Sequence, residues 1–409
     1  MKLKHLYTNI KSLCGITSGF PKYKTGGQMK EMVSLDNAWL LVSEKGTIEH
    51  FGEMKHVPEF SGNTTDCKGR IVLPCFVDSH THLVHAGYRE NEFIDRIKGF
   101  SYEQIAQRGG GILNSVKNIE KITENELFEQ SFERLNKAID LGTGAIEIKS
   151  GYGLSLQNEM KMLRVANRLK LQSPIPVKIT FLGAHAYPEQ YKYNHEKYIK
   201  ILTEEMIPAV ASESLADYID VFCEMNYFSP EEMEKILETG WKYGLKPKVH
   251  VNQFNTIGGV QSAVKNHAIS VDHLEVLSEN DIVSLQNSEC IATLLPCCSF
   301  FIKIPYSPAN KLIENDIPFC LASDYNPGSS PCLNMSFVIS LACIKMNLLP
   351  EEALNAATLN AAAALELQYD YGSIETGKKA NFIITKPISS LNYLPYSFAE
   401  NCIEKLVIS

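Results

Sequence analysis

The sequence lacks several features that mark specialised classes of protein. None of its apolar runs approaches the roughly 18 residues that a helix needs to cross a bilayer, so we expect no membrane span. A basic excess is also missing, because 39 Lys and Arg residues stand against 47 Asp and Glu residues, a formal net charge of −8. Nucleic acid favours a basic surface, so we expect no such partner. Residues 1–19 have no continuous apolar segment, which argues against a secretory signal.

A disulfide framework is not indicated either. The 409-residue chain has 11 cysteines, an odd number scattered along its length. Several lie inside apolar runs: Cys75, Cys223, Cys290, Cys320 and Cys343. Buried free thiols of a reducing compartment explain this pattern better than disulfides, so we expect a cytoplasmic protein. The adjacent pair Cys297-Cys298 has no second pair nearby, which makes it a weak zinc signal, and we interpret it as structural.

The composition that is present is globular, and its apolar runs predict a barrel. Hydrophobic residues make up 44% of the chain and charged residues 21%, which excludes disordered and fibrous classes. Eight β-rich apolar runs return at intervals, and most lack alternation, as parallel strands buried on both faces do. They are residues 71–77, 144–148, 176–182, 218–223, 247–251, 268–271, 290–295 and 318–322.

The segments between these runs have helical features. Residues 124–141 and 157–171 carry apolar residues at a spacing of three to four. Ser229 precedes Pro230 and two acidic residues, which is typical of a helix start. Eight strand–helix units favour an α/β fold of the (β/α)₈ TIM-like barrel type over an open doubly wound sheet.

The two flanks differ from the barrel. Short strand-like pieces at 39–42 and 47–51 precede it, and others at 381–385 and 403–408 follow it. Neither flank is long enough to bury a good core alone. We therefore expect residues 1–72 and 369–409 to form one small composite β-sandwich domain, with the barrel at 73–368 inserted between them.

Two glycine-containing stretches resemble nucleotide-binding motifs but fail on context. Residues 372–378 match the G-x₄-G-K spacing of a P-loop, yet Lys379 occupies the Ser/Thr position and a strand follows instead of a helix. Gly109-Gly110-Gly111 follows a polar segment and no strand, unlike a dinucleotide fingerprint. We assign no phosphate binding to either.

Histidine and aspartate gather at the ends of the predicted strands. His80 and His82 follow the first run, His250 ends the fifth, His273 ends the sixth and Asp324 follows the eighth. In a barrel, the carboxyl ends of the strands surround the active site. A single histidine there is more often a satisfied core residue, but four strand ends with His or Asp favour a bound metal. Imidazole and carboxylate suit Zn²⁺ or Fe²⁺.

With these residues the chain resembles the amidohydrolase superfamily and, within it, the imidazolonepropionase family, which opens 4-imidazolone-5-propanoate to N-formimidoyl-L-glutamate in histidine degradation. The matching stretches span the whole predicted barrel in order. They are residues 80–84, Arg89 with 91–93, 109–112, 149–154, 181–185, 220–224, 272–275, 292–296 and 322–330.

The resemblance implies one divalent metal per chain, Zn²⁺ or Fe²⁺/Fe³⁺, held by His80, His82, His250 and Asp324. A single metal is favoured because the end of the fourth strand, Cys223-Glu224, offers no lysine to bridge two. The metal would lower the pKa of bound water and make hydroxide available. Asp324 would take the water's proton, and His273 would hydrogen-bond the carbonyl or oxyanion as the cyclic amide C–N bond breaks.

The resemblance also implies the substrate contacts. The propanoate arm is an anion entering a net-negative protein, so a local cation must hold it, and Arg89 is the candidate. Tyr152, His185 and Ser329 match the other substrate contacts of the family, and Asn326 and Gly328 match contacts to the opened product. On spacing alone, Arg89 would be a solvated charge, and Tyr152 and His185 ordinary packing. We interpret His85, His195 and His267 as structural.

One departure from the family pattern concerns proton transfer. Family members usually have a glutamate two or three positions after the histidine of the fifth strand, whereas this chain has Asn252 and Gln253 there. An amide cannot carry a proton, although Gln253 can still hydrogen-bond the ring. We therefore expect His273 or His185 to bring the proton to the leaving nitrogen.

Two other functions stay open at this stage. A related deaminase of a cytosine- or guanine-like ring generally needs the missing glutamate, which counts against it. A barrel that has lost catalysis and serves as a binding module is supported only by Gln253, because inactive relatives tend to lose metal ligands. Family resemblance also favours a homodimer, and the sequence does not distinguish zinc from iron.

Overall fold

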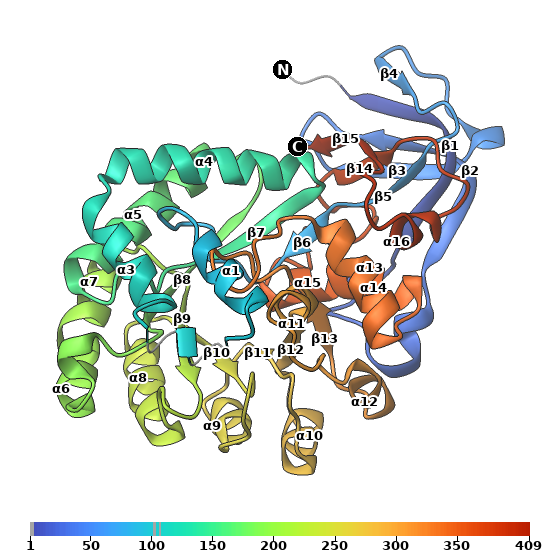
Figure 1. Cartoon of the computed structure of the whole chain (residues 1–409). Coiled ribbons are helices and arrows are strands. Elements are labelled where there is room, and N and C mark those ends of the chain that lie inside the picture. The colour runs from blue at the N-terminus through green and yellow to red at the C-terminus, as the bar shows by residue number, and fades with distance from the viewer. Residues whose placement is uncertain (1–3, 101–103, 106–107) are drawn as a thin grey trace.

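The computed structural model describes residues 4–100, 104–105 and 108–409 (Figure 1). Its larger sheet has eight strands in the order in which they occur along the chain, each parallel to the next. They are β6 (Phe76–Asp78), β7 (Thr143–Lys149), β8 (Val177–Ala184), β9 (Tyr218–Cys223), β10 (Lys246–Val251), β11 (Ser270–His273), β12 (Ile291–Leu294) and β13 (Phe319–Leu321). All eight predicted strands are present.

The sheet closes into a barrel just beyond its first and last strands. The backbone N–H of Asp324 donates to His80 at 3.0 Å, and that of His82 donates to Tyr325 at 2.8 Å. These bonds join the segment after β13 to the segment after β6. The (β/α)₈ barrel predicted from the sequence is therefore confirmed. Its closure brings two predicted metal ligands, His80 and His82, next to a third, Asp324.

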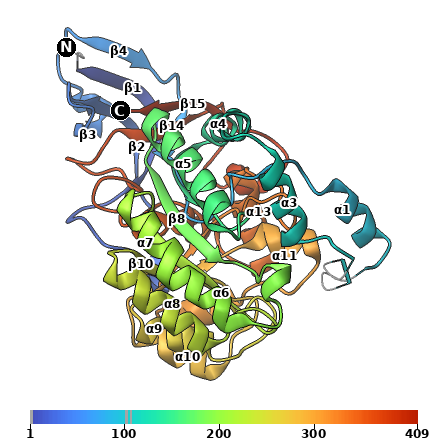
Figure 2. The same cartoon turned by 90° about the vertical axis from the view of Figure 1, so that its left-hand side faces the viewer.

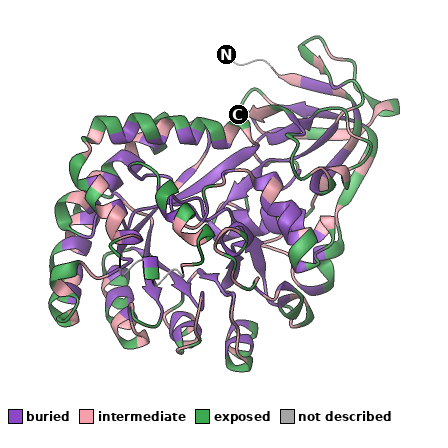
Figure 3. Cartoon of the chain, viewed as in Figure 1, coloured by how far each residue is buried: buried purple, intermediate pink, exposed green. Residues whose placement is uncertain are grey.

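Helices connect the barrel strands and cover the barrel on the outside (Figure 2). Along the chain they are α1 (Glu90–Ile97), α3 (Ile112–Lys121), α4 (Glu124–Asp140), α5 (Leu156–Gln172), α6 (His195–Ile201), α7 (Ile207–Ser212), α8 (Pro230–Lys242), α9 (Gly259–Lys265), α10 (Glu279–Gln286), α11 (Pro296–Ile302) and α12 (Ala309–Glu314). After β13 come α13 (Met335–Met346), α14 (Pro350–Ala357) and α15 (Leu359–Ala364). Buried residues concentrate on the strands and on the inner faces of these helices (Figure 3).

The helix starts follow from local sequence. Ser229 accepts a hydrogen bond from the Glu232 N–H, and the Glu232 carboxylate accepts one from the Ser229 N–H, which forms a capping box before Pro230. Thr123 and Glu126 do the same at the start of α4. Each box satisfies backbone donors that the first helical turn leaves unpaired.

Both ends of the chain contribute to a second sheet beside the barrel (Figure 1). Its strands run in the order β15-β14-β5-β1-β2-β3, and β4 pairs with β1. They are β1 (His5–Ile16), β2 (Val33–Val42), β3 (Ile48–Glu53), β4 (Asn63–Asp66), β5 (Ile71–Pro74), β14 (Asn381–Thr385) and β15 (Ile403–Ile408), with the short α16 (Tyr393–Tyr396) between the last two. The second sheet from both flanks is thus confirmed, although residues 1–3 of the expected domain lie outside the described residues.

One predicted strand divides between the two sheets. The run 71–77 forms β5 in the terminal sheet and β6 in the barrel, with Cys75 between them. The Cys75 N–H donates to Asn381 at 3.2 Å, and the next N–H, of Phe76, donates to Gly142 at 3.0 Å. Both halves are buried and apolar, so hydrophobicity alone does not reveal that the chain changes partners here.

Two further expectations concern cysteines and membranes. All 11 cysteines are free, and all except Cys332 and Cys343 are buried. Among the described helices, none is long and apolar enough to cross a membrane.

Candidate metal centre and active site

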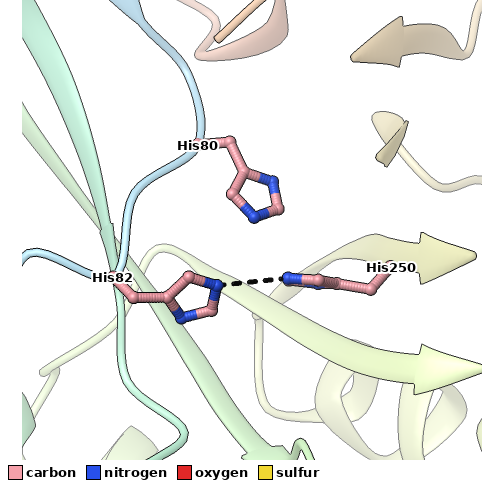
Figure 4. Close-up of side chains that lie close together, drawn as sticks. All are labelled: His80, His82 and His250. Carbon is pink, nitrogen blue, oxygen red and sulfur yellow. Dashed lines mark hydrogen bonds between the residues drawn. The ribbon is translucent and has the colours of Figure 1, made fainter. Parts of the chain in front are cut away.

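Three imidazoles converge at the carboxyl ends of the barrel strands (Figure 4). His80 and His82 follow β6, and His250 lies on β10. One ring nitrogen from each lies within 4.8 Å of the others, and Nε2 of His250 is 3.4 Å from Nε2 of His82. All three side chains are buried.

Asp324 completes a set of four donors. Its Oδ1 lies 3.5 Å from Nε2 of His80 and 3.7 Å from Nε2 of His82. Among the described residues, the buried Nε2 of His80 has no hydrogen-bond partner. Burial, with nearby positive groups, holds the pKa of His80 and of His82 well below the usual value, so both rings stay neutral. A divalent metal binds neutral imidazoles and carboxylates. These four side chains offer such donors, and the Nε2 atom of His80 has no other partner among the described residues, so the residues fit such an ion.

Two buried carboxylates hold the rings of His80 and His250 in place. Nδ1 of His80 donates to Oδ2 of Asp272 at 2.7 Å, and Nδ1 of His250 donates to Oδ2 of Asp220 at 2.9 Å. A proton held on Nδ1 leaves Nε2 free to bind a metal, which is the arrangement found behind metal-binding histidines generally. Neither aspartate was predicted as a site residue. The available signal was a charged residue inside each of two buried strands.

A second group of buried polar side chains surrounds His273. Its Nδ1 lies 3.3 Å from Oε1 of Glu275, which also accepts a hydrogen bond from Ser299 at 3.3 Å. Burial lowers the pKa of His273, but Glu275, together with Asp324 and Asp272, outweighs that effect and raises the pKa above the usual value. His273 also has a left-handed backbone, with φ at +90°. Strained backbone of this kind concentrates at functional sites.

The two amides after β10 have separate positions. Asn252, with φ at +56°, turns away and donates to Asp281 of α10 at 3.0 Å. Gln253 lines the pocket and donates from Nε2 to Sγ of Cys298 at 3.4 Å. Burial and the nearby Asp324 raise the pKa of Cys298 well above the usual value, so it stays a neutral thiol. Of the two amides, therefore, Gln253 is the one that can reach a bound ring.

Arg89 is a buried cation at the edge of the same pocket. Its side chain is only 3% exposed, and Nε lies 3.5 Å from Oε2 of Glu92. Within the described part of the chain, its Nε and Nη1 atoms make no hydrogen bond. The guanidinium packs directly over Gly328, where an added Cβ would meet Nη2 at 1.1 Å. An unsatisfied buried guanidinium facing a pocket is suited to bind a carboxylate.

His185 and Tyr152 lie beside His82 in the lining of the same pocket. The ring of His185 stacks on that of His82, with centroids 5.1 Å apart and planes 8° apart. Its Nδ1 donates to Gly151 at 3.0 Å, and burial lowers the pKa of His185 to about 3. The Tyr152 ring lies 5.4 Å from His185. His185 is thus a neutral ring with a backbone partner, unlike His273 with its carboxylate.

Asn326 shapes the loop after β13. Its Oδ1 accepts hydrogen bonds from the N–H groups of Gly328 at 2.8 Å and Ser329 at 2.7 Å. Its Nδ2 donates to Ser329 Oγ at 2.8 Å, and Arg96 donates to the Gly328 carbonyl at 2.6 Å. The loop therefore holds Gly328, a predicted product contact, and Ser329, a predicted substrate contact, in fixed positions.

One cavity connects these groups. Its lining contains every predicted substrate-binding, catalytic and metal-ligating residue except His80, which lies behind it, and Gly328, which lies under Arg89. The lining residues are His82, Arg89, Ile112, Tyr152, His185, Phe222, His250, Gln253, His273, Asp324, Asn326 and Ser329. His85, His195 and His267 are not part of this lining.

Comparison with known proteins agrees with this geometry. The model of the amidohydrolase family matches residues 71–409. The imidazolonepropionase of Flavobacterium johnsoniae is 52% identical, over 98% of this chain and 98% of its own. That of Alkaliphilus metalliredigens is 38% identical, over 94% of this chain and 92% of its own.

The chain belongs to the imidazolonepropionases of the amidohydrolase family.

Solved structures share the fold at low sequence identity. E. coli guanine deaminase has a TM-score of 0.74 and 14% identity, over 100% of this chain and 98% of its own. An adenosine deaminase from Xanthomonas campestris with bound zinc has a TM-score of 0.71 and 16% identity, over 99% of this chain and 92% of its own.

Family membership and three converging imidazoles, with the Asp324 carboxylate beside them, together indicate a divalent-metal site. As a member of the imidazolonepropionases, the chain is a hydrolase of C–N bonds in cyclic amides. Beyond Asp220 and Asp272, sequence reasoning missed two residues of this imidazolonepropionase site, Glu275 and Cys298. Glu275 was visible only as part of the Asp272-His273-Leu274-Glu275 stretch, and Cys298 only as half of an adjacent cysteine pair.

Proposed function

We propose that this chain hydrolyses 4-imidazolone-5-propanoate to N-formimidoyl-L-glutamate in histidine degradation. The observation that supports this substrate most directly is Arg89, a buried guanidinium in the pocket beside the metal centre, whose Nε and Nη1 atoms make no hydrogen bond among the described residues. The relatives named imidazolonepropionase, at 38–52% identity, support the same substrate. A propanoate arm is the anion that such a cation would hold.

We propose that His80, His82, His250 and Asp324 hold one ion per chain, Zn²⁺ or Fe²⁺/Fe³⁺, both of which suit three imidazoles and a carboxylate. The ion supplies Lewis-acid activation of water and of the ring carbonyl. A single ion is supported at the end of β9, where Glu224 accepts hydrogen bonds from the N–H groups of Met225 and Phe254, each at 2.8 Å. Both oxygens of the Glu224 carboxylate therefore accept hydrogen bonds from nearby backbone N–H groups.

The substrate lies, in this proposal, with its carboxylate on Arg89 and its ring against Tyr152 and His185. Ser329 contacts the substrate, and Asn326 and Gly328 contact the opened product. Because Asn326 holds the backbone of residues 328 and 329 through two hydrogen bonds, the loop presents its groups in a fixed position. Fixed groups lose little entropy when the substrate binds.

Proton transfer is assigned to Asp324 and His273. Asp324 takes the proton from the attacking water, and His273 hydrogen-bonds the carbonyl and delivers a proton to the leaving nitrogen. His273 is favoured over His185 because Glu275, at 3.3 Å, stabilises an imidazolium, whereas His185 has only the Gly151 carbonyl as its partner. Gln253 then hydrogen-bonds the ring without carrying a proton.

Assembly, location and domain boundaries are also proposals. We propose a cytoplasmic homodimer with a composite domain of residues 1–72 and 369–409 and a barrel domain of 73–368. The 11 free cysteines fit a reducing compartment. Light scattering of the purified protein measures the dimer directly.

The substrate assignment is tested by comparing 4-imidazolone-5-propanoate with its propanamide, which lacks the charge. In Arg89→Met, KM for the acid should rise by about 100-fold, because a charge-assisted hydrogen bond contributes roughly 1.5–3 kcal/mol and Arg89 can form two. The amide should be affected much less. Arg108→Met removes an exposed arginine, 56% accessible, and is the matched control.

Equal losses on the acid and the amide would contradict a carboxylate on Arg89. Release of ammonia from guanine or cytosine, with no opening of the imidazolone ring, would favour the deaminase alternative.

A further inference from the structure

Lys149, on β7, lies in a fully buried cluster behind the metal centre. Its Nζ is 2.8 Å from Oδ2 of Asp220, 2.8 Å from Oε1 of Glu147 and 3.2 Å from Oδ2 of Asp272. All four side chains have no exposed surface. The ammonium therefore makes ion pairs with three carboxylates that come from three different barrel strands.

Two of these oxygens also hold metal ligands. Oδ2 of Asp220 accepts from Nδ1 of His250 at 2.9 Å, and Oδ2 of Asp272 accepts from Nδ1 of His80 at 2.7 Å. Each oxygen is thus shared between an imidazole and the same ammonium. A single lysine connects two metal-binding histidines through two carboxylates.

We propose that Lys149 is a positioning residue for the metal, because it fixes the two carboxylates that set the orientation and tautomer of His80 and His250. This inference rests on the proposed metal-dependent function. Two buried carboxylates would repel each other without a cation between them, and each could then rotate away from its imidazole. The groups behind metal ligands typically contribute ten- to a hundredfold in metal affinity.

The geometry also distinguishes this role from that of a carboxylated lysine bridging two metals. A carboxylated lysine is an anion, and here it would face three carboxylates within 3.2 Å. Burial alone lowers the pKa of Lys149, but Asp220, Glu147 and Asp272 outweigh it and raise the pKa above the usual value. The side chain stays a cation, consistent with one metal per chain.

A second buried lysine provides a matched control. Lys248 on β10 has no exposed surface and forms its ion pair with Glu147. Its Nζ also donates to the backbone carbonyl of Ser79 at 3.3 Å. Lys248→Met therefore removes the same charge from the same cluster, but it leaves the contacts of Lys149 with Asp220 and Asp272 in place.

The test measures the Zn²⁺ dissociation constant of the full-length protein by competition with a chromophoric chelator. It is read together with the Tm of each metal-free variant. Lys149→Met should weaken Zn²⁺ binding at least tenfold, and Lys248→Met by less than threefold, at a comparable loss of Tm. Wild-type affinity in Lys149→Met, or equal weakening in both variants, would overturn the inference.

A charge-balanced variant covers the case in which Lys149→Met does not fold. Glu147→Gln with Lys149→Gln removes one cation and one anion together, and it should show the same loss of Zn²⁺ affinity. An affinity equal to that of the wild type would again overturn the inference. The positioning role of Lys149 and the proposed function are tested separately, because Zn²⁺ affinity is measured without substrate. Lack of turnover by the metal-loaded wild type contradicts only the proposed function.

Discussion

At the scale of single residues, the acid–base groups that we propose, His273 and Asp324, lie at the end of β11 and just after β13. The segment after β10, where the family usually has a glutamate, contributes none of them. Gln253 reaches the pocket but bonds to the Cys298 thiol, while Glu275 lies 3.3 Å from His273. A carboxylate is thus present behind His273, just after another strand, and in our proposal it supports proton transfer. This arrangement explains how the chain can retain ring-opening activity with amides at positions 252 and 253.

Replacing Gln253 with glutamate tests whether that amide only hydrogen-bonds the ring. We expect kcat to fall about tenfold with unchanged metal content, because an additional buried carboxylate without a donor costs roughly 1–3 kcal/mol. Steady-state kinetics and metal analysis of Gln253→Glu measure both quantities. A large gain in kcat would show instead that the native glutamine is a handicap or serves another substrate.

Glu275→Gln tests the partner of His273. It removes the charge that stabilises an imidazolium but keeps a hydrogen-bond acceptor of the same shape, so kcat should fall about 100-fold while KM changes little. The double variant with His273→Asn should be no slower than His273→Asn alone, since the two residues act as a unit. Additive losses would indicate that Glu275 acts independently of His273.

At the scale of elements, the loop after β13 positions Arg89 as much as it forms the pocket wall. Gly328 has no positive φ, so its backbone would accept alanine, but the added Cβ would meet Nη2 of Arg89 at 1.1 Å. Gly328→Ala should therefore displace the guanidinium and raise KM for the acid at least tenfold, with metal content unchanged.

Gly27→Ala, at a position with no atom within 4 Å of the new Cβ, is the control for that variant. An unchanged KM in Gly328→Ala would mean that Arg89 does not hold the substrate in the position seen here.

Strands and their ends were largely predictable, whereas their partners were not. Each of the eight apolar runs overlaps one of the eight barrel strands, because burial on both faces requires continuous apolar sequence. The division at Cys75 was not predictable, since both halves of that run are equally apolar. Pairing with β14 in one sheet and β7 in the other depends on residues far away in the sequence.

The candidate site shows the same limit. His80 and His82 share one side because Thr81 between them pairs with Tyr325, which extends the strand alternation past β6. Alternation fails after β10, where Asn252 has φ at +56° and turns out of the pocket, so Gln253 enters instead. Asp220 and Asp272 were visible as charges in apolar strands and within the family-like stretches 220–224 and 272–275. Their contacts were not visible, because their histidine partners are 30 and 192 positions away along the chain.

At the scale of the whole molecule, the loop that returns from the barrel to the terminal sheet is held by a buried cation. Lys378 has no exposed surface, and its Nζ donates to the Gln368 carbonyl at 2.5 Å and to Ser373 Oγ at 2.7 Å. Its backbone carbonyl accepts from Ile48 of β3 at 2.8 Å. The G-x₄-G-K stretch is therefore a structural connection between distant parts of the chain.

Burial lowers the pKa of Lys378 from 10.5 to about 8, which predicts a pH dependence of stability. Below pH 8 both states hold the proton. Between about pH 8 and 10.5 the folded state has lost it and the unfolded state has not, so the free energy of unfolding rises with pH. The free energy of unfolding in urea, taken as the difference between the wild type and Lys378→Met, should show this rise with pH. Lys379→Met is the control and should keep the rise that the wild type shows. A flat difference between pH 8 and 10.5 would contradict a lowered pKa of Lys378 in the folded state.

The most direct test of the account is turnover of 4-imidazolone-5-propanoate by the purified, metal-loaded chain, followed by detection of N-formimidoyl-L-glutamate. We predict about one divalent metal per chain, ring opening that is lost when a chelator removes the metal, and recovery when Zn²⁺ or Fe²⁺ is restored. A folded, fully metallated sample that leaves the ring intact would contradict the proposed function.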